Sequence, residues 1–195
     1  MNVLILSPYA DRLLKAITAC GDEYIVTSDP ISYSFCVENK IDYIVSYGYR
    51  FILTEKVLAS VSWNAVNLHI SLLPYARGAH PIFWSILEDR PVGVTIHRIS
   101  KGLDTGDILL QQKLDFNIET ETFRSCYTMN SDLIERLFIE EWERIRVNAI
   151  PAAPQSRTGS YHRASELDAW RACLPLGWDT PIDLFKYLAR ESGVN

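Results

Sequence analysis

Short hydrophobic runs alternate with amphipathic segments along the first part of the chain. The apolar run Asn2 to Leu6 predicts a buried strand, and the spacing of apolar residues from Asp11 to Cys20 predicts a helix. The alternation continues with strands expected at 24–27, 43–46 and 65–70, and with short helices at 34–39 and 54–60, the second capped by Thr54 or a neighbour. Strands that alternate with helices favour a doubly wound, mostly parallel sheet with helices on both faces.

The pattern changes after residue 70. Pro81 suits the first turn of a helix expected at 80–87, and alternating residues at 93–99 and 108–116 predict two further strands. A long amphipathic helix is expected over 122–146, and a last apolar helix near 182–188. We therefore predict an α/β, Rossmann-like catalytic domain over residues 1–150 and a short C-terminal extension over 151–195 that packs on it.

Composition excludes several classes of function. A chain of 195 residues, of which 48% are hydrophobic, can bury one sizeable core. The net charge of −5 argues against a broad basic face for nucleic acid, so transfer RNA is a poor candidate substrate. We find no signal peptide and no apolar run near the roughly 18 residues of a membrane span. The four cysteines lack paired spacing, so we expect neither zinc nor disulfides in a soluble, cytoplasmic protein.

Three polar residues have the chemistry of an acyl-transfer site. Asn67 and His69 are two residues apart and share a face if their segment is a strand, and Asp104 lies in the glycine-flanked loop 102–107. An amide can donate to a developing oxyanion, an imidazole can move protons near neutral pH, and a carboxylate can orient the imidazole. Each residue alone is more often a turn former, a cap or a core histidine. Their combination favours catalysis.

These residues sit in motifs that resemble one family. The run NLHISLLP at 67–74, then Arg77-Gly78, GVTIH at 93–97 and GLDTGDI at 102–108, is similar to 10-formyltetrahydrofolate-dependent formyltransferases. The resemblance covers residues 40–115 well and the rest loosely. It implies a Rossmann-like catalytic domain that uses 10-formyltetrahydrofolate as co-substrate without a metal. It also implies that Asn67, His69 and Asp104 carry out the transfer to an amine.

The resemblance further implies where the folate binds. In the family, a loop after the third strand holds the pterin through backbone groups, which correspond here to Phe51, Ile52 and Leu53. The loop that contains Gly102 and Asp104 is expected to complete the folate site. Without the family, the aromatic residues of the first loop would more often belong to the core.

Three other residues are candidates for contact with the acceptor. Tyr75, Arg77 and His97 are placed where they could meet a phosphate or a sugar, although a structural role fits each of them equally well.

Departures from the family narrow the choice of acceptor. The turn at Ser7 to Asp11 has a proline and no glycine, whereas glycinamide ribonucleotide enzymes have a glycine-rich phosphate turn there. In the tail, Tyr161-His162-Arg163 resembles an element of sugar-nucleotide N-formyltransferases, or packs the tail against the sheet. We therefore predict an N-formyltransferase for a small primary amine, a nucleotide-linked amino sugar.

Two alternatives remain open. One is a 10-formyltetrahydrofolate hydrolase, in which water replaces the acceptor at the same site. The other is a catalytically inactive folate- or nucleotide-binding module. Trp and Tyr residues in the tail are typical interface material, so a homodimer is also compatible with the sequence.

Overall fold

A computed structural model describes residues 1–156 and 158–193, which fall into two compact units. The first unit comprises Met1–His69, Thr95–Leu110 and Ile134–Gln155. The second comprises Ile70–Val94, Gln111–Leu133 and the described residues from Ser156 onward. The chain therefore passes between the units several times. The expected domain boundary at residue 150 stays a prediction.

The described residues contain a six-stranded sheet in the order β2-β1-β3-β4-β6-β7. Strands β2, β1, β3 and β4 run parallel to one another, and β6 runs antiparallel to β4. This mostly parallel α/β arrangement confirms the predicted fold class. The strands span Asn2–Leu6 (β1), Glu23–Thr27 (β2), Tyr43–Tyr47 (β3), Ala65–His69 (β4), Gly93–Arg98 (β6) and Ile108–Lys113 (β7).

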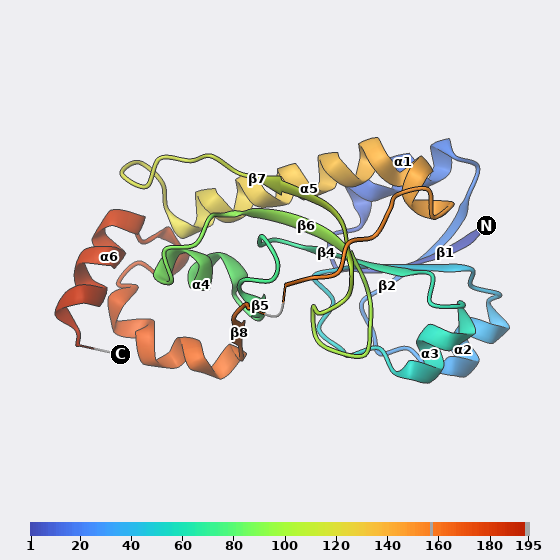
Figure 1. The fold of residues 1–195 in the computed structure, drawn as a ribbon, viewed down its shortest axis with the longest axis horizontal. Coiled ribbons are helices and arrows are strands. Elements are labelled where there is room, and N and C mark those ends of the chain that lie inside the picture. Colours follow the sequence, from blue (N-terminus) through green and yellow to red (C-terminus); the bar gives the residue numbers. More distant parts are fainter. Residues whose placement is uncertain (157, 194–195) are drawn as a thin grey trace. The chain divides into compact units, whose positions relative to one another are not determined.

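Helices cover both faces of the strands in the first unit (Figure 1). Side chains of a strand alternate between faces, so Leu4 and Ile44 pack with residues of α2 (Tyr33–Glu38) and α3 (Glu55–Ser60). On the opposite side lie α1 (Asp11–Ala19) and α5 (Phe123–Arg146). There the Tyr43 ring meets the Trp142 ring of α5 edge to face at 5.3 Å. The Thr54 hydroxyl accepts from Val57 N and caps α3, as expected.

The second unit has an aromatic core. The rings of Phe83, Phe123 and Phe185 lie with their centroids 5.0 to 5.7 Å apart, and all three side chains are buried. Phe83 belongs to α4 and Phe185 to α6, so the core joins segments that are far apart in the sequence. The elements here are β5 (Arg77–Gly78), α4 (Pro81–Leu87), β8 (Tyr161–His162), η1 (Ala164–Cys173), η2 (Gly177–Asp179) and α6 (Ile182–Glu191).

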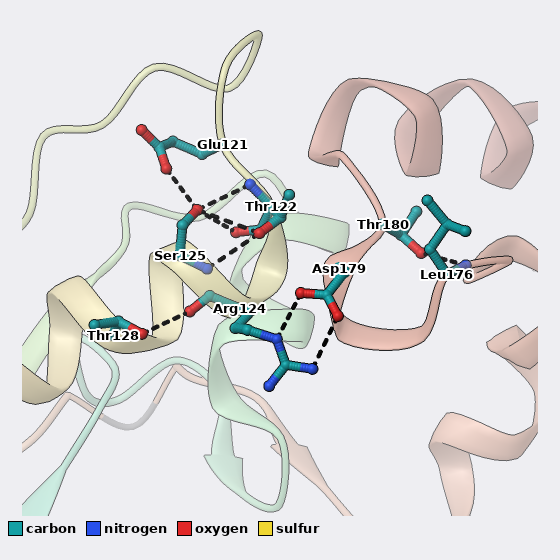
Figure 2. Close-up of polar contacts among 8 residues, drawn as sticks. All are labelled: Glu121, Thr122, Arg124, Ser125, Thr128, Leu176, Asp179 and Thr180. Carbon is teal, nitrogen blue, oxygen red and sulfur yellow. Dashed lines mark hydrogen bonds and ion pairs between the residues drawn. The ribbon is translucent and has the colours of Figure 1, made fainter.

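Polar contacts fix the start of α5 in the second unit (Figure 2). Thr122 and Ser125 form reciprocal bonds, because each backbone N–H donates to the other's hydroxyl, at 2.9 and 3.1 Å. Arg124 donates to both carboxylate oxygens of Asp179, at 2.5 and 3.0 Å, and so joins α5 to η2.

The hydrophobic pattern predicted the main helices and strands better than it predicted their ends and the short elements between them. The strand expected at 108–116 ends at Lys113, and the last helix continues to Glu191. The pairing of β5 with β8 and the 3-10 helix η1 were not predicted. A two-residue strand contains no measurable alternation, and a 3-10 helix does not repeat its apolar residues at the α-helical period. No helix in the described part of the chain is long and apolar enough to cross a membrane.

A buried carboxylate joins distant parts of the first unit. The Asp22 side chain is fully buried and accepts hydrogen bonds from Arg146, from Trp142 Nε1 and from the amino terminus of Met1, at 2.6 to 3.2 Å. Burial by itself would raise the pKa of Asp22, but the hydrogen bonds and charges of Arg146 and the terminal ammonium outweigh it. The pKa of Asp22 therefore lies below its usual 3.8.

We expect Asp22→Asn to lower the free energy of unfolding at pH 7 by about 3 kcal/mol, because two cations lose a buried partner. Since the folded-state pKa is depressed, this contribution is complete above the unfolded-state value of 3.8 and is lost as the pH falls through the lower folded-state pKa. Urea denaturation of both proteins between pH 7 and pH 3 would measure the difference and its decline.

Asp168→Asn is the matched control, because Asp168 also pairs with an arginine but both side chains are largely exposed. We expect it to change the free energy of unfolding by less than about 1 kcal/mol. An Asp22 variant as stable as this control would contradict the assignment.

Candidate active site

Strand β4 presents the amide and the imidazole on one face. Asn67 and His69 are two residues apart, while Val66 and Leu68 are buried in the alternate positions. Both polar residues reach the same carboxylate. Asn67 Nδ2 donates to Asp104 Oδ1 at 3.1 Å, and His69 Nδ1 lies 3.7 Å from Asp104 Oδ2. The three predicted catalytic residues are therefore close neighbours within the first unit.

This cluster is shielded from solvent. The side chains of His69 and Asp104 are 8% and 9% exposed, so charges within the cluster interact more strongly than they would in water. The distance of 3.7 Å between His69 Nδ1 and Asp104 Oδ2 is longer than that of a direct hydrogen bond. Such contacts are often long in enzymes without substrate and shorten when the reacting complex forms.

His97 is a fourth member of the cluster. Because β6 is antiparallel to β4, His97 lies directly opposite Asn67. Its Nε2 is 3.3 Å from Asn67 Nδ2 and 3.5 Å from Asp104 Oδ1, and its side chain is 2% exposed. Its Nδ1 lies 2.8 Å from the carbonyl of Arg98. A carbonyl can only accept, so Nδ1 carries a proton and Nε2 of the neutral ring is an acceptor.

The Asn67 amide is oriented by two partners. Its nitrogen carries two hydrogens, and these are directed to Asp104 Oδ1 and to His97 Nε2. The amide is therefore held in a single orientation before any substrate arrives. An oxyanion would receive one of these donors, and the longer contact to His97 is the easier one to exchange.

The loop that contains Asp104 folds back over this face of the sheet. It begins where Ile99 N donates to Ala65 O, at the opposite end of β4 from His69, and ends where Asp107 O accepts from Arg98 N. Asp104 has a φ of 52°, in the left-handed region that costs a non-glycine residue about 1 to 2 kcal/mol. A Cβ at Gly102 would lie 2.3 Å from Thr105 Oγ1, so a side chain there would require Thr105 to move.

The expected folate loop exposes apolar side chains. It follows β3, whose Ser46 and Tyr47 pair with Asn67 and Leu68 of β4. Ile52 is 81% exposed and Phe51 is 49% exposed. Leu53, in contrast, packs partly buried against the core. Phe51 and Ile52 are thus two adjacent exposed apolar residues of this loop.

Tyr49 anchors the same loop. Its hydroxyl donates to Asp29 O at 2.9 Å, and its ring contacts that of Phe51 at 5.5 Å. Burial raises the pKa of the Tyr49 phenol above its usual value of 10.0, so the hydroxyl stays protonated and keeps donating across the physiological range.

Tyr75 and Arg77 belong to the second unit. The guanidinium of Arg90 lies 4.7 Å from the centre of the Tyr75 ring, and the Tyr75 carbonyl accepts from the Ser71 hydroxyl. Arg77 is in β5, and its backbone N–H donates to Ser160 O. The expected contact of Tyr75 and Arg77 with an acceptor stays a prediction.

The tail element Tyr161-His162 packs within the second unit. The His162 ring stacks on Trp84 at a centroid distance of 3.8 Å and an interplanar angle of 8°. Its two nitrogens lie 2.6 Å from Glu88 and 3.0 Å from Glu166. Hydrogen bonds from His162 and from the Arg163 backbone lower the pKa of Glu166. These contacts favour the packing interpretation of this motif.

Sequence reasoning missed one residue of the first unit. Gln155 follows α5, and its amide nitrogen donates to the carbonyls of Asp104 and Gly106. It sits in an irregular segment, and no motif or periodicity marks it. Among residues 1–156 and 158–193, no three His, Cys, Asp or Glu side chains form a group that could hold a metal ion.

A family model described as formyl transferase matches residues 33–140 of the chain. The formyltransferase PseJ of Anoxybacillus kamchatkensis, solved in complex with UDP-4,6-dideoxy-4-formamido-L-AltNAc and tetrahydrofolate, is 38% identical. That similarity covers 95% of this chain and 97% of PseJ, with a TM-score of 0.89.

Methionyl-tRNA formyltransferases are similar over part of their length. That of Methylacidiphilum infernorum is 40% identical over 118 residues, which are 60% of this chain and 37% of the relative. That of Prochlorococcus marinus (strain MIT 9515) is 35% identical over 75% of this chain and 45% of the relative. The chain thus spans less than half the length of these two relatives.

The contact with Arg98 O determines the tautomer of His97. We expect neutral His97 to carry its proton on Nδ1, and two-dimensional ¹⁵N–¹H correlation spectra of the histidine rings would show it. A His97→Gln variant assigns the signals. Protonation of the neutral ring on Nε2 instead would contradict the arrangement, because Nε2 could then no longer accept from Asn67.

Proposed function

The chain belongs to the formyl transferase family, and we propose that it moves a formyl group from 10-formyltetrahydrofolate to a primary amine of a nucleotide-linked amino sugar. The observation that carries this proposal is the buried contact of one carboxylate, Asp104, with both an amide and an imidazole. Amide, imidazole and carboxylate are the groups that acyl transfer to an amine requires.

Each residue has a separate task in this reaction. The acceptor nitrogen bonds to the formyl carbon, the bond from that carbon to the folate nitrogen breaks, and one proton passes from the amine to the folate. His69 takes up and returns the proton, and Asp104 stabilises its cationic form. Asn67 donates to the formyl oxygen as negative charge develops on it, which is worth about 3 to 4 kcal/mol for one such donor.

The loop after β3 supports folate as the formyl donor. It adjoins the catalytic strand through the pairing of β3 with β4, and it exposes the apolar Ile52 and Phe51. A pterin is flat, with an apolar face and polar edges, so it can cover these side chains while backbone groups of the loop contact its edge. The PseJ structure, which contains tetrahydrofolate, is consistent with this choice.

An amino sugar nucleotide is supported over transfer RNA. PseJ, which was crystallised with a formylated amino sugar nucleotide, matches nearly the whole of this chain, whereas the methionyl-tRNA enzymes match over less than half of their length. The net charge of −5 also disfavours the phosphate contacts that a large RNA requires.

A screen of acceptors with 10-formyltetrahydrofolate tests the proposal. Amino sugars linked to uridine or thymidine diphosphate, glycinamide ribonucleotide and methionyl-tRNA would each be incubated with protein, and mass spectrometry would detect formylation. We expect a gain of one formyl group on an amino sugar nucleotide. Rapid release of formate without an acceptor would support the hydrolase alternative, and folate binding without any turnover would support the inactive module.

Replacing the catalytic carboxylate should stop transfer without unfolding the protein. We expect Asp104→Asn to lower kcat by at least about 100-fold, because the cationic imidazole loses its stabilising charge. His69→Ala should have a similar effect, of about 10² to 10⁴. Initial rates under saturating substrates, with circular dichroism as a test of folding, would measure this.

Asp107→Asn is the matched control for Asp104→Asn. Asp107 lies in the same loop, but it is exposed to solvent. We expect its substitution to leave kcat within about twofold of the wild type, as is usual for surface changes. A folded His69→Ala or Asp104→Asn variant that turns over as fast as Asp107→Asn would refute the assignment.

The exposed isoleucine should contribute to folate affinity alone. We expect Ile52→Ser to raise the Kd for tetrahydrofolate about tenfold, which corresponds to roughly 1.4 kcal/mol of lost apolar contact. Because the side chain is 81% exposed, thermal stability should not change. Titration by tryptophan fluorescence would give the Kd. An unchanged Kd would place the pterin elsewhere.

A further inference from the structure

One side chain from the segment after α5 contacts the backbone of the Asp104 loop twice. Gln155 Nε2 donates to the Asp104 carbonyl at 2.9 Å and to the Gly106 carbonyl at 2.7 Å. The amide nitrogen has two hydrogens, so both of them are directed to carbonyls of the same turn. One of these carbonyls therefore belongs to Asp104 itself, the residue whose carboxylate we assign to catalysis.

The position of Gln155 is itself determined by backbone pairing. Ile108 and Ala153 form an isolated antiparallel bridge with two hydrogen bonds of 2.8 Å each. Ile108 is the first residue of β7, so the bridge aligns the segment after α5 with the end of the Asp104 loop. Gln155 is two residues beyond Ala153, and its side chain reaches back to the loop from there.

The loop needs such an external support. Asp104 is in the left-handed region of φ, which a non-glycine residue occupies stably only when its surroundings hold it there. Gly106 is pressed against the chain, because a Cβ there would lie 1.8 Å from Arg98 O. The Asp104 carbonyl accepts from Gln155 while the Asp104 carboxylate accepts from Asn67. Gln155 therefore bonds to the backbone at the residue whose side chain has to be placed.

We propose that Gln155 is a positioning residue, which keeps the backbone of Asp104 in the conformation that directs the carboxylate toward Asn67 and His69. Gln155 bonds to backbone carbonyls of the loop, so the role assigned to it is exerted through Asp104. The proposal rests on the proposed function only for its effect on turnover, since the effect on the order of the loop is independent of any reaction.

Gln155→Met tests the proposal, because methionine has similar length and no donor. We expect kcat to fall by about tenfold to 100-fold, as is typical when a catalytic group is displaced by about 1 Å. KM for the acceptor should stay within about twofold, because the residues expected to meet it, Tyr75 and Arg77, lie outside this loop. A kcat equal to that of the wild type would overturn the proposal.

Asn2→Leu is the matched control. Asn2 Nδ2 also donates to two backbone carbonyls of the first unit, those of Asn39 and Lys40, at 3.5 and 3.1 Å. Asn2 is in β1, which is separated by β3 from β4, the strand that Asp104 contacts. Asn2→Leu likewise removes two bonds from a side-chain amide to backbone carbonyls, although these are longer than those of Gln155, and its kcat should equal that of the wild type. Loss of kcat in both variants would reduce Gln155 to a general structural role.

A double-mutant cycle separates action through Asp104 from action elsewhere. In the Asp104→Asn background, Gln155→Met should lower kcat by no more than about twofold further, because the carboxylate it positions is gone. If the two substitutions multiply in their effects, Gln155 acts independently of Asp104 and the proposal is wrong.

Hydrogen exchange gives a result that needs no activity. We expect the amides of residues 100–107 to exchange at least about tenfold faster in Gln155→Met than in the wild type, with no such change in Asn2→Leu. If the wild type fails to transfer formyl groups but this exchange pattern holds, the proposed function fails and the positioning role stands. Unchanged exchange in the loop would overturn the positioning role even in an active enzyme.

Discussion

The antiparallel pairing of β6 with β4 is the constraint on which the whole site depends. Parallel neighbours would bring strand ends together at one edge, but β6 runs back along β4 and places His97 opposite Asn67. The loop that follows therefore starts beside Ala65, away from His69. It can bring a carboxylate to the imidazole only by folding back over the face of the sheet. The left-handed φ of Asp104, the close approach of Gly106 and the contacts of Gln155 all occur in the segment that makes this return.

The same constraint makes the site preorganised. The Asn67 amide already contacts both His97 and Asp104 before a substrate is present, and the side chains of His97 and Asp104 are only 2% and 9% exposed. In such surroundings each hydrogen bond is stronger than in water, and a mispaired group is costly. The orientation of the amide is thus determined by the fold, and little reorganisation is needed when charge develops during the reaction.

How much of this site the sequence predicted depends on how far apart along the chain the contacting residues lie. Asn67 and His69 could be placed on one face because alternation in a strand is local, and Asp104 could be identified from its glycine-flanked loop. The register of β6 has no local signal, so the sequence could not show that His97 lies opposite Asn67, and its expected contact with the acceptor stays a prediction. Gln155 is 51 residues from Asp104, in a segment without periodicity, and only the folded chain brings them together. The core strands were predictable for the same reason as Asn67, because a run of apolar residues within one strand is a local signal.

The distribution of residues between the two units bears on the acceptor. Asn67, His69, His97 and Asp104 all belong to the first unit, whereas Tyr75 and Arg77, the residues expected to meet the acceptor, belong to the second. Formyl transfer to any primary amine needs the same proton movements and the same oxyanion donor. Under the proposed roles, substitutions in the second unit would change which amine is bound without altering the groups assigned to the chemistry. Relatives of this chain are named both for transfer RNA and for sugars, as this division of roles leads us to expect.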